Sequence, residues 1–130
     1  NVGKAQGVLM QHIDRILTVW GRFANSRIGT EYPCIAAGMR LAVDPPSDYN
    51  IFNLTDDTCI LIGEQIMRLK EKQDLRYDII MAKYALRIDD EQIWKILNIS
   101  RANYFNKLAE AKSYVEGAID GAEIIAYFYA

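Results

Sequence analysis

The sequence has little of what a covalently stapled, metal-bound or membrane-spanning protein needs. Its 130 residues include two cysteines and one histidine, which argues against a structural zinc site and against a disulfide framework. Two isolated cysteines fit a reducing, cytoplasmic compartment. No apolar run is as long as the about 18 residues that a membrane-spanning helix needs. With 51% hydrophobic residues and a net charge of −2, the chain is expected to fold rather than stay disordered.

Enzymatic machinery is also missing from the pattern. The single histidine, His12, has no cysteine, serine or acid at an arranged spacing, and no glycine-rich phosphate loop follows a strand. An acidic run, Asp89-Asp90-Glu91, could attract a cation, but the start of a helix explains it as well. The sequence therefore predicts a protein that is not an enzyme and has neither a cofactor nor a metal site.

Proline occurs only three times, and all three prolines lie in one segment, residues 25–54 (Pro33, Pro45 and Pro46). Helical periodicity fades there, which predicts a long loop. Loops of about 30 residues are uncommon in compact domains and are usually functional.

The rest of the chain repeats apolar residues at three- and four-residue spacing, which is typical of amphipathic helices. We expect an all-α protein of about five helices, with residues 1–130 forming one compact domain. The helices are predicted near residues 4–24, 55–72, 75–86, 89–97 and 100–116. Thr55 or Asp56, a capping box at Asp89-x-x-Gln92, and Ser100 are the expected helix starts. Gly21 is unusual inside a helix, so either that helix ends early or another backbone packs closely against it.

Residues 89–116 have the spacing of a helix-turn-helix: a short helix, a turn of about three residues and a longer helix. The predicted core that fixes the two helices consists of Ile93, Leu97, Ile99, Tyr104 and Leu108. The outward face of the second helix would then supply the candidate DNA-binding residues. Arginine can pair with guanine, asparagine with adenine and lysine with phosphate; these candidates are Ser100, Arg101, Asn103, Asn106 and Lys107.

Two features disagree with this interpretation. The acids at 89–91 would face DNA if the first helix crossed its backbone closely, and Trp94 stands where a helix-turn-helix usually has a small residue. A tryptophan there must separate the two helices or turn outward. A helical protein-interaction adaptor that does not bind DNA therefore remains an alternative.

A second basic region lies at residues 68–87, with six basic side chains against three acidic ones. Such a stretch is either a solvated surface or a local electropositive face. The candidates for contact with phosphate or with a protein partner are Arg68, Lys70, Lys72, Lys83 and Arg87.

Between Ile16 and Ile119 the chain resembles the phage late-gene antitermination proteins of the Q type. The resemblance rests on motifs that are weak singly and informative in their order: Val19-Trp20-Gly21, Tyr32-Pro33-x-x-Ala36-Ala37-Gly38, Asp56-Asp57, Met67-Arg68-Leu69-Lys70, Tyr77-Asp78-Ile79-Ile80-x-x-x-Tyr84, Ile93 to Leu97, Ser100-Arg101, Lys107-Leu108-x-x-Ala111 and Val115-Glu116-Gly117. The segment at 89–116 also resembles the promoter-reading region of bacterial sigma factors.

This resemblance implies a function that composition alone does not. It implies binding to double-stranded DNA beside a late promoter, engagement of paused host RNA polymerase holoenzyme with sigma still attached, and passage through pauses and terminators. The basic residues of 68–87 and the 25–54 loop would be candidates for polymerase contact. It also implies that the protein acts in the host bacterial cytoplasm and does not bind a membrane. Self-association is left open. A helix-turn-helix regulator of transcription initiation is the nearest alternative.

Overall fold

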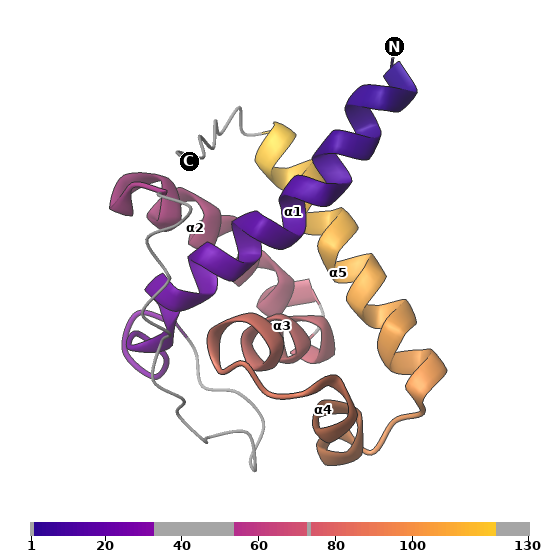
Figure 1. Ribbon diagram of the computed structural model, residues 1–130. Coiled ribbons are helices and arrows are strands. Elements are labelled where there is room, and N and C mark those ends of the chain that lie inside the picture. The colour runs from indigo at the N-terminus through magenta and orange to yellow at the C-terminus, as the bar shows by residue number, and fades with distance from the viewer. Residues whose placement is uncertain (1, 33–53, 73, 122–130) are drawn as a thin grey trace.

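The computed structural model describes residues 2–32, 54–72 and 74–121, and these form an all-α arrangement (Figure 1). No strand occurs in these ranges, apart from an isolated bridge between Ile28 and Tyr32. The helices are α1 (Val2–Asn25), α2 (Asp56–Lys72), α3 (Asp74–Ile80), α4 (Asp90–Leu97) and α5 (Arg101–Gly121), with a π-helical segment, η2 (Met81–Ala85), after α3. The predicted fold class is confirmed, whereas most of the predicted loop, residues 33–53, lies outside the described residues.

Gly21 allows α1 and η2 to approach each other closely. A Cβ atom at this position would lie 2.0 Å from the carbonyl oxygen of Tyr84. The Asn25 side-chain amide also donates a hydrogen bond of 2.7 Å to the Ala85 carbonyl. Because α1 continues through Gly21 to Asn25, the second of the two predicted explanations, close packing by another backbone, is confirmed.

The predicted helix at 75–86 is not uniform. It begins as α3 and widens into the π-helical turn η2 over Met81–Ala85. The Ile88 N–H donates to the Ala82 carbonyl at 2.9 Å, and Arg87 between them has a φ of 58°. Hydrophobic spacing predicts a helix here, but it does not reveal a change of helix type.

One hydrophobic core joins these elements. Trp20 on α1, Tyr77 on α3 and Tyr104 on α5 are its largest fully buried side chains. Figure 1 shows α1 lying obliquely across the other helices, with α4 and the start of α5 at the end of the molecule farthest from the first turn of α1. Burial of each large apolar side chain stabilises the fold by about 1.5–3 kcal/mol. None of the described helices has an apolar stretch long enough to cross a membrane.

Candidate nucleic-acid interface

Helices α4 and α5 are joined by a turn of three residues whose geometry is fixed by hydrogen bonds. Asn98 adopts a left-handed conformation, with a φ of 57°, and ends α4. The Ile99 N–H donates to the Trp94 carbonyl at 3.0 Å. The Asn103 N–H donates to the Ser100 hydroxyl at 3.0 Å, so Ser100 caps α5 as predicted.

The residues predicted to hold the two helices together are all in or against the core. Ile93, Tyr104 and Leu108 are buried, and Leu97 and Ile99 are half-buried and pack against them. The apolar sides of α4 and α5 therefore face the interior, and this leaves the opposite side of the first turns of α5 exposed.

Asp90 adds a polar link to this apolar contact. Its carboxylate accepts a hydrogen bond from the Tyr104 hydroxyl and another, at 2.9 Å, from the Lys83 ammonium group. Burial alone would raise the pKa of Asp90, but the hydrogen bonds from Tyr104 and Lys83 outweigh it and lower that pKa. Asp90 thus connects η2, α4 and α5.

Two of the three acids at residues 89–91 have cationic partners in the structure. Asp90 points to Lys83 and Tyr104, and Glu91 pairs with Lys95 at 3.1 Å, so these two charges are offset within the protein. The predicted capping box is wrong in detail. Asp89 stands at the helix start, but its side chain makes no capping hydrogen bond. Long-range partners such as Lys83 are not visible in local sequence.

A second polar link ties α5 to α1. The Asp14 carboxylate accepts a hydrogen bond of 2.6 Å from the Tyr84 hydroxyl and pairs with Lys112 at 3.0 Å. Burial acts to raise the pKa of Asp14, but the contacts with Tyr84 and Lys112 lower it overall. Burial and the neighbouring Asp14 carboxylate raise the pKa of Tyr84. These contacts hold α5 in a fixed position on the rest of the fold.

The five candidate DNA-binding residues lie together in the first two turns of α5 and at its cap. Four of them are exposed: Ser100, Arg101, Asn103 and Asn106. The fifth, Lys107, is half-buried and pairs with Glu110 at 3.4 Å. The Arg101 guanidinium lies 5.7 Å from the centre of the Phe105 ring, which restricts where this cation can point.

Trp94 is accommodated in an aromatic cluster. Its ring centre lies 5.7 Å from that of Tyr104 and 5.9 Å from that of Phe105. Trp94 is half-buried, whereas Phe105 is 40% exposed beside Arg101. Phe105 is thus an exposed aromatic side chain within the candidate surface.

The second basic set falls into two places. Arg68, Lys70 and Lys72 lie in the last turns of α2, where Lys70 and Lys72 each lie 5.3 Å from the centre of an aromatic ring, Tyr77 and Tyr114 respectively. The other two residues lie elsewhere: Lys83 is within η2, and Arg87 follows its end. With Thr18 and Tyr84 they line a cavity of about 180 Å³.

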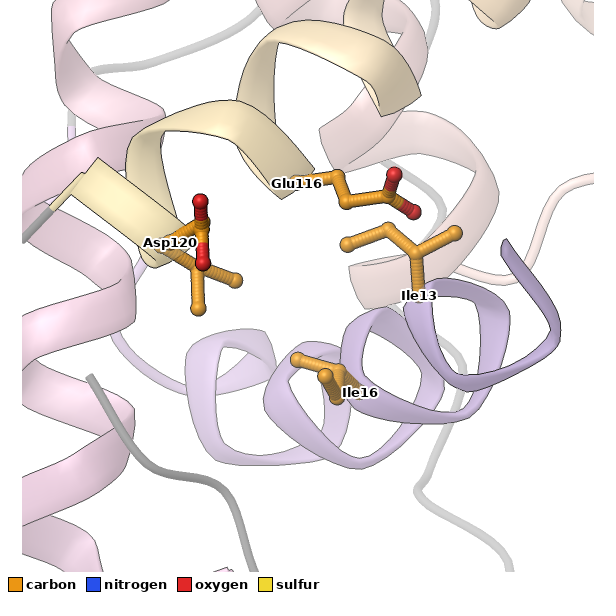
Figure 2. Close-up of a pocket in the computed structure, with 5 residues that line it drawn as sticks. Ile13, Ile16, Glu116 and Asp120 are labelled. Atoms are coloured by element: carbon orange, nitrogen blue, oxygen red, sulfur yellow. The ribbon is translucent and has the colours of Figure 1, made fainter. Parts of the chain in front are cut away.

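A smaller cavity lies between α1 and α5. It measures about 80 Å³, and Figure 2 shows Ile13 and Ile16 pointing from α1 toward Glu116 and Asp120 on α5. Its walls are mostly apolar, yet Glu116 Oε2 is buried without a hydrogen-bond partner in the described part of the chain. Among the residues that line this cavity, Asp120 is exposed, whereas Glu116 is half-buried.

The described residues contain no group of three or more potential metal ligands. Cys59 is buried, and desolvation raises the pKa of its thiol to about 11, so it stays protonated at neutral pH.

Comparison with known proteins gives one match. A family model described as phage antitermination protein Q matches residues 10–125, which include α4, α5 and all ten candidate side chains. No curated protein and no solved structure matches the chain.

Proposed function

The chain belongs to the phage antitermination protein Q family, and from this membership we propose that it binds DNA near a late promoter and loads onto paused RNA polymerase. The family consists of transcription regulators rather than enzymes, and its general role is antitermination. In the proposed mechanism the protein travels with the polymerase and makes it read through pauses and terminators.

The observation that carries the proposal is the exposed start of α5. Arg101, Asn103 and Asn106 are exposed there, while Ile93, Tyr104 and Leu108 bury the opposite side. Arginine and asparagine present the donors and acceptors that distinguish base edges in a major groove. The Asp90 contacts fix the angle at which α5 is presented. We therefore assign α5 as the reading helix of a helix-turn-helix formed by α4 and α5.

Few cations accompany this surface. Arg101 is exposed, and Lys107 is shared with Glu110. With about three or four phosphate contacts, log K would fall against log[salt] with a slope of roughly −3. Binding to DNA alone is then weak, and contact with the polymerase must contribute the rest.

The polymerase contacts are proposed to come from basic residues outside α5. Arg68, Lys70 and Lys72 form one group at the end of α2, and the 25–54 segment is a second candidate. The partners are double-stranded DNA and host RNA polymerase holoenzyme with sigma attached, in the host bacterial cytoplasm. No cofactor is required for binding of this kind.

Transcription in vitro tests the proposal. On a template that carries the natural late promoter and a downstream terminator, adding the protein should raise the fraction of full-length transcript. Arg101→Ala should reduce this gain, while Lys95→Gln, which changes an exposed cation outside the proposed set, should not. No gain of readthrough with the wild-type protein would reject antitermination.

Transcript number, promoter occupancy and binding, measured beside readthrough, separate the alternatives. A regulator of initiation changes promoter occupancy and the number of transcripts, but it leaves the fraction that passes the terminator unchanged. An adaptor that binds only protein keeps all its binding when Arg101→Ala and Lys107→Ala are combined.

A further inference from the structure

Arg87 occupies a backbone position that normally takes glycine or asparagine. Its φ is 58°, and it lies between Leu86, whose N–H donates to the Met81 carbonyl, and Ile88, whose N–H donates to the Ala82 carbonyl. These hydrogen bonds close the end of η2, and a residue in the left-handed conformation commonly completes such an ending. An arginine is strained there because its Cβ crowds the neighbouring carbonyl oxygen.

The Arg87 side chain makes no contact in residues 2–32, 54–72 and 74–121 that compensates for this strain. Arg87 is exposed, and the described residues give its guanidinium no hydrogen-bond or ion-pair partner. When a residue other than glycine keeps a strained backbone conformation and its side chain makes no stabilising contact, a functional role for that side chain is indicated.

The cavity beside Arg87 indicates what that function is. Arg87 and Lys83 line it together with Thr18 and Tyr84, and its volume of about 180 Å³ is ample for a phosphate group. Two carboxylates that contact the residues of this cavity already have a cation. Asp90 pairs with Lys83 at 2.9 Å, and Asp14 pairs with Lys112 at 3.0 Å. The Arg87 guanidinium, by contrast, has no ion pair among the described residues and is available for an anion.

We propose that Arg87 and Lys83 hold a backbone phosphate of DNA in this cavity. A phosphodiester carries one negative charge and acceptor oxygens, which match a guanidinium fork and the ammonium hydrogens that Lys83 does not give to Asp90.

The inference rests on the proposed function, because the phosphate belongs to the duplex that α5 reads. The Asp90 carboxylate contacts both Lys83 and Tyr104, so a single side chain separates the cavity wall from the first turn of α5.

Binding of fluorescent duplex DNA by purified full-length variants tests the inference. Arg87→Gly and Arg87→Asn remove the charge and suit the backbone, so their Tm should equal or exceed that of the wild type by a few degrees, about 2–4 °C at most. Their affinity for the late-promoter duplex should fall about tenfold. The slope of log K against log[salt] should become less negative by about 0.9, which is one phosphate contact.

Two controls separate this contact from a general effect of charge. Lys95→Gln removes an exposed cation on α4 and should leave the slope unchanged. Arg87→Lys keeps a cation and should retain most of the slope. Because a phosphate carries no sequence information, the loss should be the same on an unrelated duplex.

The outcomes distinguish the inference from its premise. If the wild type binds duplex DNA and Arg87→Gly binds it equally well with the same slope, the phosphate site is wrong while the proposed function stands. A marked loss of Tm in both Arg87→Gly and Arg87→Asn would show that Arg87 is structural, and it would overturn the inference. An effect on single-stranded RNA of the same sequence but not on the duplex would overturn the assignment to DNA. If the wild type binds no duplex, both proposals fail.

Discussion

The Tyr104 hydroxyl donates a hydrogen bond to the Asp90 carboxylate and so joins the first residue of α4 to the fourth residue of α5. The same carboxylate holds Lys83 of η2. The angle between the two C-terminal helices therefore depends on a polar contact as well as on apolar packing. Removing that contact should loosen the surface that we propose for DNA.

Tyr104→Phe tests this link while it retains the buried ring. We expect the free energy of unfolding to fall by about 1–2 kcal/mol, because a hydrogen bond to a charged group is lost. Urea denaturation measures the change. Tyr114→Phe is the matched control, since the described residues give the Tyr114 hydroxyl no hydrogen-bond partner. Equal losses in the two variants would contradict the role of the Asp90 contact.

The lowered pKa values of Asp90 and Asp14 predict a loss of stability in acid. An unfolded aspartic acid has a pKa of about 3.9, so the unfolded chain binds more protons below that pH than the native one. The stabilisation is complete above this value and is lost as the pH falls through the native pKa.

Thermal unfolding between about pH 5 and pH 2 measures this dependence. Asp90→Asn should make Tm depend less steeply on pH over that interval, because one of the two groups no longer titrates. A variant curve that runs parallel to that of the wild type would contradict the assignment.

Local pattern predicted much of this fold, and it failed where partners are distant in sequence. Hydrophobic spacing predicted the helices and the five residues between α4 and α5 because each helix buries one face. It did not predict η2, since a single widened turn leaves the spacing of apolar residues nearly unchanged. The pair of Asp90 with Lys83 depends on how η2 meets α4. The cavity at Arg87 depends on how η2 meets α1, because Thr18 forms part of its wall. The binding roles of the α5 residues stay predictions.

Gly21→Ala should destabilise the protein by about 2 kcal/mol or more, because overpacking at a close backbone contact forces the two elements apart. The clash is with the Tyr84 carbonyl oxygen, 2.0 Å from the added Cβ, and backbone cannot move aside as a flexible side chain can. Gly117→Ala is the control. It is a helical glycine with nothing within 4 Å of the added atom, and it should stabilise by about 0.5–1 kcal/mol. Chemical denaturation of both variants should give shifts of opposite sign.

Arg101→Ala and Lys107→Ala should weaken DNA binding in different ways under the proposed function. Loss of a base contact by Arg101 costs about 1–3 kcal/mol on the natural site and relaxes the preference at one base pair. Loss of a phosphate contact by Lys107 weakens binding evenly across sequences and reduces the salt slope by about 0.9. Competition binding with single-base variants of the site distinguishes the two. A uniform loss in both variants would remove Arg101 from the base-reading role.

Glu116→Met should stabilise the protein, even though it removes a charge from the surface of α5. Glu116 Oε2 is buried without a partner among the described residues, and Ile13 and Ile16 face it across the small cavity of Figure 2. A desolvated carboxylate oxygen costs about 1–3 kcal/mol, and a methionine would extend the apolar wall instead. We expect a gain of about 1 kcal/mol in urea denaturation, whereas Asp120→Asn, at an exposed position beside it, should change stability by less than about 0.5 kcal/mol. A loss of stability in Glu116→Met would mean that the carboxylate has a partner in native protein. The Glu116 side chain would then make a stabilising polar contact in this cavity, and the cavity would not be a packing defect.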